Sequence, residues 1–245
     1  MNEKLPLAIE IEINSDCNLS CAYCPNAKSE RSEKGLMARE LFETIMRQLQ
    51  KYDYSGRISY HFYNEPTLSP DLNHFVSLTK KFLPRAKSIL YSNGTKLNRE
   101  KIDQLYADGL DRFIITEHHQ AKLHNLDFIS DDKSLYTANR FKFSSYKELP
   151  MTNRGGAVKA GVRISEPLKT PCFIPRCVLV ITVKGNVLAC YEDYFQSHVM
   201  GNVAETDLFE IWNSDKYAYF RNELKEGNRH KFEVCKTCNN QLIIV

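Results

Sequence analysis

The distribution of its eight cysteines constrains this 245-residue chain more than any other sequence feature. Three of them, Cys17, Cys21 and Cys24, lie within eight residues, and residues 25–171 contain none. Clustered cysteines in a reducing compartment are more typical of metal ligation or catalysis than of disulfides. The sequence therefore predicts two separate metal sites, the second formed from among the later cysteines, which are Cys172, Cys177, Cys190, Cys235 and Cys238.

The composition is that of an ordinary globular protein, with 42% hydrophobic and 26% charged residues. A net charge of +3, from 33 Lys and Arg against 30 Asp and Glu, argues against a nucleic-acid-binding surface. The apolar run at residues 177–183 is far shorter than the ~18 residues of a membrane span. Because Glu10 and Glu12 interrupt the apolar stretch near the N-terminus, it does not resemble a secretory signal. We expect a cytoplasmic protein that binds neither membranes nor nucleic acids.

Strand and helix patterns alternate through the first half of the chain. Strands are predicted at residues 7–14, 57–62, 88–91 and 113–116, and helices at residues 38–52, 71–82 and 98–107. This order implies an α/β fold with parallel strands joined by crossover helices. In the last third, apolar stretches on both sides of Lys184-Gly185-Asn186 predict a β-hairpin, and helices are predicted at residues 208–213 and 216–226.

The spacing C-x3-C-x2-C of the first three cysteines indicates an iron–sulfur cluster with one open corner. A cube of four irons ordinarily takes four thiolates, and no fourth cysteine is near in the sequence. The remaining iron would be free to bind a chelating ligand. A zinc site is the alternative, although structural zinc requires a closed set of four ligands. Packing of buried thiols is the third interpretation.

Other polar residues follow the predicted strands in the same way as the cysteines. Cys17, Glu65, Asn93 and Glu117 each come just after a strand. Because parallel β/α sheets bind ligands at the carboxyl ends of their strands, we expect these residues to lie at one site. Taken singly, Glu65 and Asn93 would be ordinary turn residues.

The segment Cys17-Asn18-Leu19-Ser20-Cys21-Ala22-Tyr23-Cys24 resembles the signature of the radical S-adenosylmethionine (SAM) enzymes. This resemblance implies a partial, shortened β/α barrel and a cluster whose open iron binds the amino and carboxylate groups of SAM. Further residues match positions that contact SAM in that family, although Asn64 stands where a glycine is usual. The implied SAM-binding residues are Tyr23, near the adenine, together with Asn64, Glu65, Ser92, Asn93 and Glu117.

The later cysteines resemble the ligands of the small auxiliary-cluster domain, called twitch or SPASM, of some radical SAM enzymes. The resemblance implies a closed second cluster suited to electron transfer, hence two [4Fe-4S] clusters in all. Its implied division is a radical SAM barrel at residues 1–168 and an auxiliary-cluster domain containing the hairpin at residues 169–245. A ribbon-type zinc site remains the alternative. The implied ligands are Cys172, Cys190, Cys235 and Cys238.

Cys177 is left over, and three roles remain open for it. Its alternation with Leu179 and Ile181 favours an inward-facing strand residue and thus a buried structural thiol. It could instead be an alternate cluster ligand, or a thiol that donates a hydrogen atom to a substrate radical. The last role would make the enzyme an epimerase.

In length and motif order the chain is similar to the radical SAM dehydrogenases of aminocyclitol antibiotic biosynthesis. This implies an oxidoreductase in which a 5′-deoxyadenosyl radical removes hydrogen from a secondary alcohol, giving a ketone as an electron passes to the auxiliary cluster. The implied partners are an aminocyclitol or other polyol substrate and an electron-donor protein such as a flavodoxin or ferredoxin. The absence of a G-x-G-x-x-G fingerprint argues against a nicotinamide-dependent enzyme.

Candidate catalytic residues flank the predicted strands and the hairpin. Arg154, in a glycine-flanked turn, resembles a position that faces the substrate in this family, and because arginine stays charged we expect it to orient a substrate hydroxyl. A role as a base is the alternative, since a ketyl hydroxyl is far more acidic than an alcohol. Glu192 and Asp193 are competing bases, with exposed loop positions as the alternative. Three tyrosines are candidate walls of the substrate site or else core residues: Tyr63, Tyr91 and Tyr191.

Three other functions remain as alternatives to the dehydrogenase. They are a radical SAM epimerase of a carbohydrate or aminoglycoside that uses Cys177 as hydrogen donor, a peptide-modifying radical SAM enzyme, and a zinc-stabilised binding protein without catalysis.

Overall fold

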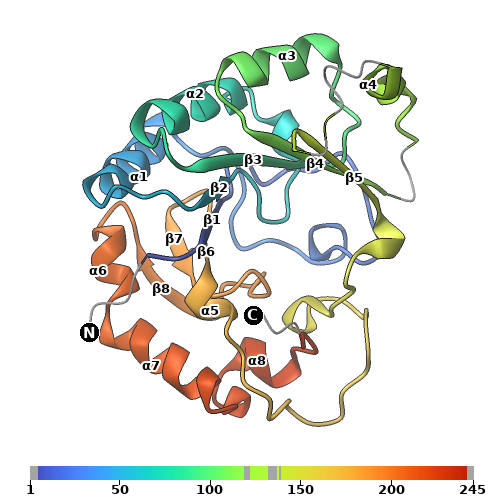
Figure 1. Ribbon diagram of the computed structural model, residues 1–245. Coiled ribbons are helices and arrows are strands. Elements are labelled where there is room, and N and C mark those ends of the chain that lie inside the picture. Colours follow the sequence, from blue (N-terminus) through green and yellow to red (C-terminus); the bar gives the residue numbers. More distant parts are fainter. Residues whose placement is uncertain (1–4, 119–121, 132–136, 138, 242–245) are drawn as a thin grey trace.

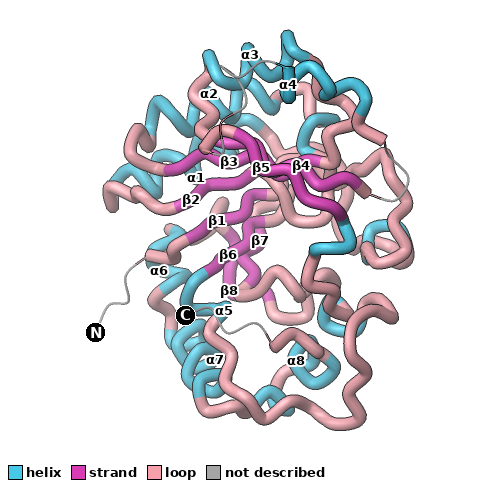
Figure 2. Tube along the Cα trace, turned by 45° about the vertical axis from the view of Figure 1, so that its right-hand side comes forward, coloured by secondary structure: helices cyan, strands magenta, loops and turns pink. Residues whose placement is uncertain are grey.

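A computed structural model describes residues 5–118, 122–131, 137 and 139–241 of the chain. Its strands form one eight-stranded sheet in the order β5-β4-β3-β2-β1-β6-β7-β8, which Figure 2 shows as a single curved layer. Neighbouring strands from β5 to β6 are parallel, and the last two pairs are antiparallel. The strands are β1 Ala8–Ile11, β2 Arg57–Ser59, β3 Lys87–Ser92, β4 Arg112–Glu117, β5 Phe141–Ser145, β6 Val178–Ile181, β7 Asn186–Leu188 and β8 Val199–Asn202.

The helices confirm the alternation predicted from the sequence, because α1, α2 and α3 each connect two neighbouring parallel strands. Figure 1 shows these three helices together on one side of the sheet, with α7 and α8 across the molecule from them. The helices are α1 Arg39–Lys51, α2 Leu72–Phe82, α3 Arg99–Ala107, α4 Asp127–Asp131, α5 Ile174–Cys177, α6 Leu208–Trp212, α7 Asp215–Lys225 and α8 Glu233–Thr237.

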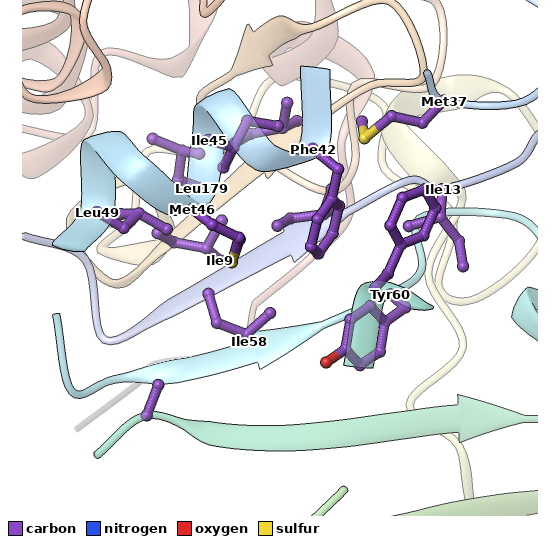
Figure 3. Packing of buried hydrophobic residues seen from close by; sticks show 14 of the residues in the cluster. Ile9, Ile13, Met37, Phe42, Ile45, Met46, Leu49, Ile58, Tyr60 and Leu179 are labelled. Carbon is purple, nitrogen blue, oxygen red and sulfur yellow. The ribbon is translucent and has the colours of Figure 1, made fainter. Parts of the chain in front are cut away.

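The apolar face of α1 shows how the crossover helices are held. Phe42, Ile45 and Met46 recur at helical spacing and are fully buried. Figure 3 shows these side chains packed over Ile9 of β1 and Ile58 of β2. Burial of each such side chain contributes about 1.5–3 kcal/mol, so this stripe fixes the helix on the sheet. The rigid sheet beneath then holds the loops at the strand ends.

The last third of the chain extends the same sheet. β6 pairs in parallel with β1, from Ala8↔Val178 to Ile11↔Ile181. The predicted hairpin is confirmed as β6 and β7, with Gly185 in the left-handed region at φ +87°. The sequence did not predict β8, because Val199–Asn202 lacks apolar alternation and contains Gly201. Strands from before and after residue 168 belong to the same sheet, and the division of the chain into two domains at that residue stays a prediction.

The parallel strands bring four loops to one edge of the sheet. The loops that follow β1, β2, β3 and β4 carry Cys17, Glu65, Asn93 and His118 respectively. This is the edge at which parallel sheets bind ligands. Within the described residues, the chain has no helix with the length and hydropathy needed to cross a bilayer.

Candidate active site

The first three cysteines line a cavity of about 180 Å³ at the carboxyl ends of the parallel strands. This cavity, called here the strand-end cavity, also collects most of the predicted SAM-binding and substrate-binding side chains. Among the described residues that line it, no fourth cysteine is present. Its polar and aromatic lining includes Tyr23, His61, Tyr63, Asn64, Glu65, Tyr91, Ser92, Asn93, Thr116, His118 and Arg154.

The thiols of Cys17, Cys21 and Cys24 lie on the loop between β1 and the short helix Pro25–Ala27. A backbone hydrogen bond from Cys24 N to Cys21 O, 3.0 Å long, folds the loop tightly. Burial raises the pKa of the Cys17 thiol to about 11, with a smaller contribution from the charge of Glu65. Metal binding must therefore displace protons from these thiols. Three thiols beside an open cavity suit a cluster with one corner left for a ligand.

Glu65 ties the loops after β2 and β3 together. Its carboxylate is 1% exposed and accepts hydrogen bonds from Thr67 N (3.0 Å), Thr67 Oγ1 (2.6 Å), Ser92 Oγ (2.8 Å) and Asn93 N (2.7 Å). Its own backbone N–H donates to Asp16 O at 2.8 Å, beside the first cysteine. The predicted residues Glu65, Ser92 and Asn93 therefore form one network against the cysteine loop.

Asn64 and Asn93 complete that network. The Asn64 side chain accepts from Phe62 N at 2.9 Å and donates to Asn14 Oδ1 at 2.7 Å, so it braces its own turn. Asn93 Nδ2 donates to Asn18 Oδ1 at 2.9 Å and lies 4.0 Å from Cys17 Sγ. Asn93 is therefore a neighbour of the predicted cluster as well as a predicted SAM-binding residue. Hydrogen bonds to the sulfurs of an iron–sulfur cluster influence the reduction potential of the cluster.

Aromatic side chains close the cavity on the side of β4. The hydroxyl of Tyr23 contacts His118 Nδ1, and its ring stacks on Tyr146 at a centroid distance of 5.8 Å. Glu117 does not join them, because it is exposed and lines a separate cavity of about 630 Å³. Its predicted contact with SAM stays a prediction, and Thr116 and His118 lie nearer the cysteine loop.

Another part of the cavity wall is formed by Tyr63, Tyr91, His61 and Arg154. Tyr91 stacks on His61 at 4.4 Å and accepts a hydrogen bond from Arg57. The guanidinium of Arg154 lies 5.9 Å from the centre of the Tyr63 ring. Its Nε is buried and has no hydrogen-bond partner among the described residues. This wall thus offers aromatic faces and a cationic donor, which suit a small polar molecule.

The charge of Arg154 is well maintained despite its surroundings. Burial acts to lower its pKa, but interactions with Tyr63 and with the Glu192 carboxylate raise the pKa above its usual value. Glu192 Oε1 lies 3.9 Å from the Arg154 guanidinium. Arg154 therefore remains a hydrogen-bond donor at any working pH.

The later cysteines line a second, small cavity, called here the auxiliary cavity. Cys172, Cys190, Cys235 and Cys238 all border it, as the resemblance predicts. Backbone N–H groups donate to two of the sulfurs, from Glu192 N to Cys190 Sγ at 3.3 Å and from Asn240 N to Cys238 Sγ at 3.4 Å. Four thiols with N–H···S contacts suit a closed iron–sulfur cluster. No group of three His, Cys, Asp or Glu side chains within the described ranges is placed to hold a single metal ion.

Cys177 borders neither cavity. The prediction that it is an inward-facing strand residue was wrong, because it ends α5 and is only half-buried. Pro175 at the start of that helix and the helical turn after it shift the strand to begin at Val178. Its side chain packs against the small apolar cluster that contains Val178 and Cys190, at the amino end of β6.

A thin layer of side chains separates the two cavities. Tyr63 belongs to the strand-end cavity, and its hydroxyl donates to Tyr191 O at 2.7 Å, one residue after Cys190. The Tyr191 side chain does not border the strand-end cavity but lies behind Tyr63, with its hydroxyl accepting from Asn240 Nδ2 at 3.3 Å. Glu192, 1% exposed, borders the auxiliary cavity.

Comparison with known proteins decides the family. The chain is 41% identical over 238 residues to the S-adenosyl-L-methionine-dependent 2-deoxy-scyllo-inosamine dehydrogenase of Niallia circulans, covering 97% of this chain and 94% of that protein. The sequence model of the radical SAM superfamily matches residues 11–116. The chain belongs to the radical SAM superfamily. The SPASM iron–sulfur cluster-binding domain matches residues 172–239, so SAM and iron–sulfur clusters are its cofactors.

Solved structures agree with this radical SAM assignment. The crystal structure of BtrN in complex with AdoMet and 2-DOIA matches with a TM-score of 0.90 at 41% identity, covering 99% of this chain and 96% of that chain. BtrN in an open conformation matches with a TM-score of 0.77 at 36% identity, covering 97% and 94%. The predicted α/β fold with a C-terminal cluster domain is confirmed, and the enzyme is an oxidoreductase.

His61 and His118 are site residues that the sequence analysis missed. Both border the strand-end cavity, and His61 Nδ1 is buried without a hydrogen-bond partner among the described residues. The signal was available, since each follows the end of a parallel strand, as the predicted residues do.

Proposed function

We propose that this radical SAM enzyme oxidises a secondary alcohol of an aminocyclitol, or a related sugar-like alcohol, to a ketone. The observation that carries this proposal is the placement of the two cysteine groups on either side of the layer that contains Tyr63 and Arg154. A substrate against that layer has a SAM-type site on one side and a closed thiol set on the other. The similar protein of Niallia circulans is named for its action on 2-deoxy-scyllo-inosamine.

The chain's own residues divide between two cofactor sites. Cys17, Cys21 and Cys24 would hold the SAM-binding cluster, and Cys172, Cys190, Cys235 and Cys238 the auxiliary cluster, each of the [4Fe-4S] type. When bound and reduced, the first cluster with SAM would supply a 5′-deoxyadenosyl radical for removal of hydrogen from the carbinol carbon, and the second would accept the remaining electron. The predicted SAM-binding residues would orient the nucleotide along the strand ends; they are Tyr23, Asn64, Glu65, Ser92, Asn93 and Glu117.

Substrate positioning falls to Tyr63, Tyr91 and Arg154. The two rings form apolar faces against which a cyclitol ring packs, and both are held by hydrogen bonds to neighbouring segments. The Nε–H of Arg154 is buried and has no hydrogen-bond partner among the described residues, so the Arg154 guanidinium donates to a substrate hydroxyl. Fixing that hydroxyl places its carbon toward the cysteine loop, which is the geometric requirement for selective hydrogen removal.

The position of the candidate bases favours Glu192 over Asp193. Asp193 is engaged by Ser197 N, Ser197 Oγ and His198 N at 2.8–2.9 Å and borders neither cavity. Glu192 accepts hydrogen bonds from Thr152 Oγ1 at 2.9 Å and Asn240 Nδ2 at 2.8 Å, but unlike Asp193 its carboxylate also lies 3.9 Å from the Arg154 guanidinium. A proton released from the substrate hydroxyl therefore has a carboxylate acceptor behind Arg154. Tyr191 supports this layer through its backbone carbonyl rather than as a wall of the cavity.

The epimerase alternative requires a hydrogen donor at the substrate, and Cys177 does not supply one from its observed position. It lies at the amino end of β6, whereas the strand-end cavity opens at the carboxyl ends. Nothing in the described residues favours the peptide-modifying alternative.

The test is an anaerobic reaction with SAM, a chemical reductant and candidate aminocyclitols. We expect 5′-deoxyadenosine together with a ketone that has lost two hydrogens, and about eight irons per chain. In deuterated water an epimerase would instead give an alcohol with carbon-bound deuterium. Stoichiometric zinc without iron, or SAM that stays intact under reduction, would contradict the proposal.

A further inference from the structure

One surface segment near the auxiliary cavity carries two cationic side chains that pair with no described residue. Residues 159–163, called here the basic loop, have the sequence Lys159-Ala160-Gly161-Val162-Arg163 between β5 and α5. Lys159 and Arg163 are exposed and make no hydrogen bond or ion pair with any described residue. Val162 between them is 72% exposed. Two free cations around an apolar side chain are the composition of a charge-guided contact surface.

The basic loop is fastened directly to the segment that carries a cluster cysteine. Asn239 follows Cys238, and its Nδ2 donates to Ala160 O at 2.9 Å and to Val162 O at 2.8 Å. Gly161 permits this approach, because a Cβ there would lie 2.4 Å from Met151 O and 2.7 Å from Asn239 Nδ2. The loop therefore has a fixed position relative to Cys238.

This fastening shortens the route from the auxiliary cavity to the surface. Cys238 is only 7% exposed, so its sulfur is largely shielded from a partner. From Cys238 the route follows the peptide bond to Asn239, the bonds of the Asn239 side chain and one hydrogen bond to the backbone oxygen of Val162. Electron transfer is favoured by covalent and hydrogen-bonded links, and the route ends at the backbone of Val162, an exposed residue between the two cations.

The surroundings of the loop are cationic. A cavity of about 670 Å³ lies between the loop and α8 and is bordered by Lys159, Arg163 and Lys236, with Glu166 as the one acidic residue among its described borders. Lys236 pairs with Glu233, so the unpaired charge resides on Lys159 and Arg163. Figure 1 shows this part of the chain on the side of α8, away from α2.

We propose that the basic loop docks a small acidic electron-carrier protein of the flavodoxin or ferredoxin type, which takes an electron from the auxiliary cluster. The inference rests on the proposed function, in which substrate oxidation removes one hydrogen atom, one proton and one electron. The hydrogen atom goes to the adenosyl radical, the proton to a protein carboxylate and then to solvent, and the electron through the cluster to the oxidised carrier. Transient electron-transfer contacts are small and depend on complementary charge.

The experiment measures binding of oxidised flavodoxin to the cluster-loaded enzyme at low and raised salt. The test variant is Lys159→Glu/Arg163→Glu, and the matched control is Lys80→Glu/Lys81→Glu on α2, which reverses two other exposed lysines. We expect the Kd of the test variant to rise about tenfold at low salt and its salt dependence to flatten, while the control stays within about twofold. Lys159→Gln/Arg163→Gln should show a smaller loss in the same direction.

Several results would overturn the docking proposal. Unchanged flavodoxin affinity in the test variant would do so, as would an equal loss in the control, because steering by overall charge would then suffice. Loss of self-association in place of flavodoxin binding would assign the loop to a second copy of the chain. Should the Glu variant fail to load iron, the Gln variant decides by the same criteria.

The proposed function is checked separately in the same preparations. All variants should form ketone with a chemical reductant in place of flavodoxin. If wild-type enzyme forms none under those conditions, the proposed function fails, whatever the binding data show. If ketone forms and the affinity for flavodoxin does not depend on the basic loop, only the docking proposal fails.

Discussion

The two cysteine regions differ in what surrounds them, and the proposed function gives each region a different task, SAM binding for the first and electron transfer for the second. Cys17, Cys21 and Cys24 lie on a loop at the mouth of a cavity, with a polar network centred on Glu65 beside them. Cys190 and the other predicted auxiliary ligands line a small cavity, where backbone N–H groups donate to the sulfurs of Cys190 and Cys238. A substrate site between them needs both properties.

The difference also concerns how the thiols are supported. The first three come from one continuous loop, whereas the later four come from segments around α5, β7 and α8 that must fold together. The second site is thus a product of tertiary structure, and its cluster should stabilise the C-terminal third of the chain.

The largest expected effect comes from Cys17→Ala. Removing one of three ligands should abolish the SAM-binding cluster and lower 5′-deoxyadenosine formation by at least about 10³-fold. Quantification of 5′-deoxyadenosine and of iron per chain checks this. Cys177→Ala is the control and should retain both, since that thiol borders neither cavity. Full SAM cleavage by the Cys17 variant would remove the distinction between the two regions.

Cys190→Ala should separate SAM cleavage from ketone formation. We expect 5′-deoxyadenosine to persist while ketone falls by roughly 10²-fold or more, because the electron acceptor is lost but the SAM site is not. The measurement is the ratio of the two products. A ratio equal to that of wild type would show that the later cysteines take no part in oxidation.

Arg154→Gln should weaken substrate positioning at the layer between the two cavities. With the donor shortened and neutral, kcat/KM for the alcohol should fall about 10- to 100-fold, and more SAM should be cleaved without ketone formation. Arg47→Gln, an exposed arginine paired with Glu43 on α1, is the matched control. Equal losses in SAM affinity and in alcohol oxidation would place Arg154 at SAM and not at the substrate.

Glu65→Gln should weaken SAM binding by about tenfold while the iron content stays unchanged. An amide cannot accept all four hydrogen bonds that now join the loops after β2 and β3, and each lost bond to a charged acceptor costs about 1.5–3 kcal/mol. Equilibrium binding of SAM measures the change, with the exposed Glu100→Gln on α3 as control. Unaltered SAM affinity would make Glu65 purely a structural brace.

The smallest expected effect concerns His61 in the strand-end cavity and the way the free energy of unfolding depends on acidic pH. Burial, with a smaller effect of the Arg57 charge, lowers the pKa of His61 to about 3. The unfolded chain therefore takes up a proton that the folded chain refuses, and stability falls as the pH drops from about 6.5 toward 3. His61→Gln should lose less stability than wild type between pH 6.5 and 4 in denaturant titrations. Identical pH dependence would show that His61 is not neutral in the fold.

Local patterns were sufficient for most of the architecture. The apolar stripe of α1, the strand at residues 87–92 and the turn at Gly185 are set by nearest neighbours in the sequence, so their prediction was confirmed. Cys177 shows the limit of that reasoning. Its alternation with Leu179 resembled a strand, but Pro175 begins a helical turn that ends at Cys177.

What the sequence alone determined was the chemistry that this chain carries: two cysteine groups, a row of polar residues at strand ends, and the order of strands and helices. Tertiary structure alone decided which of those residues meet. Glu117 and Tyr191 stand beside the right motifs, but Glu117 borders a different cavity and the Tyr191 side chain does not border the strand-end cavity. His61 and Asn239 acquire their roles from segments far away in the chain. Spacing reports covalent distance, and only the folded sheet converts it into distance through space.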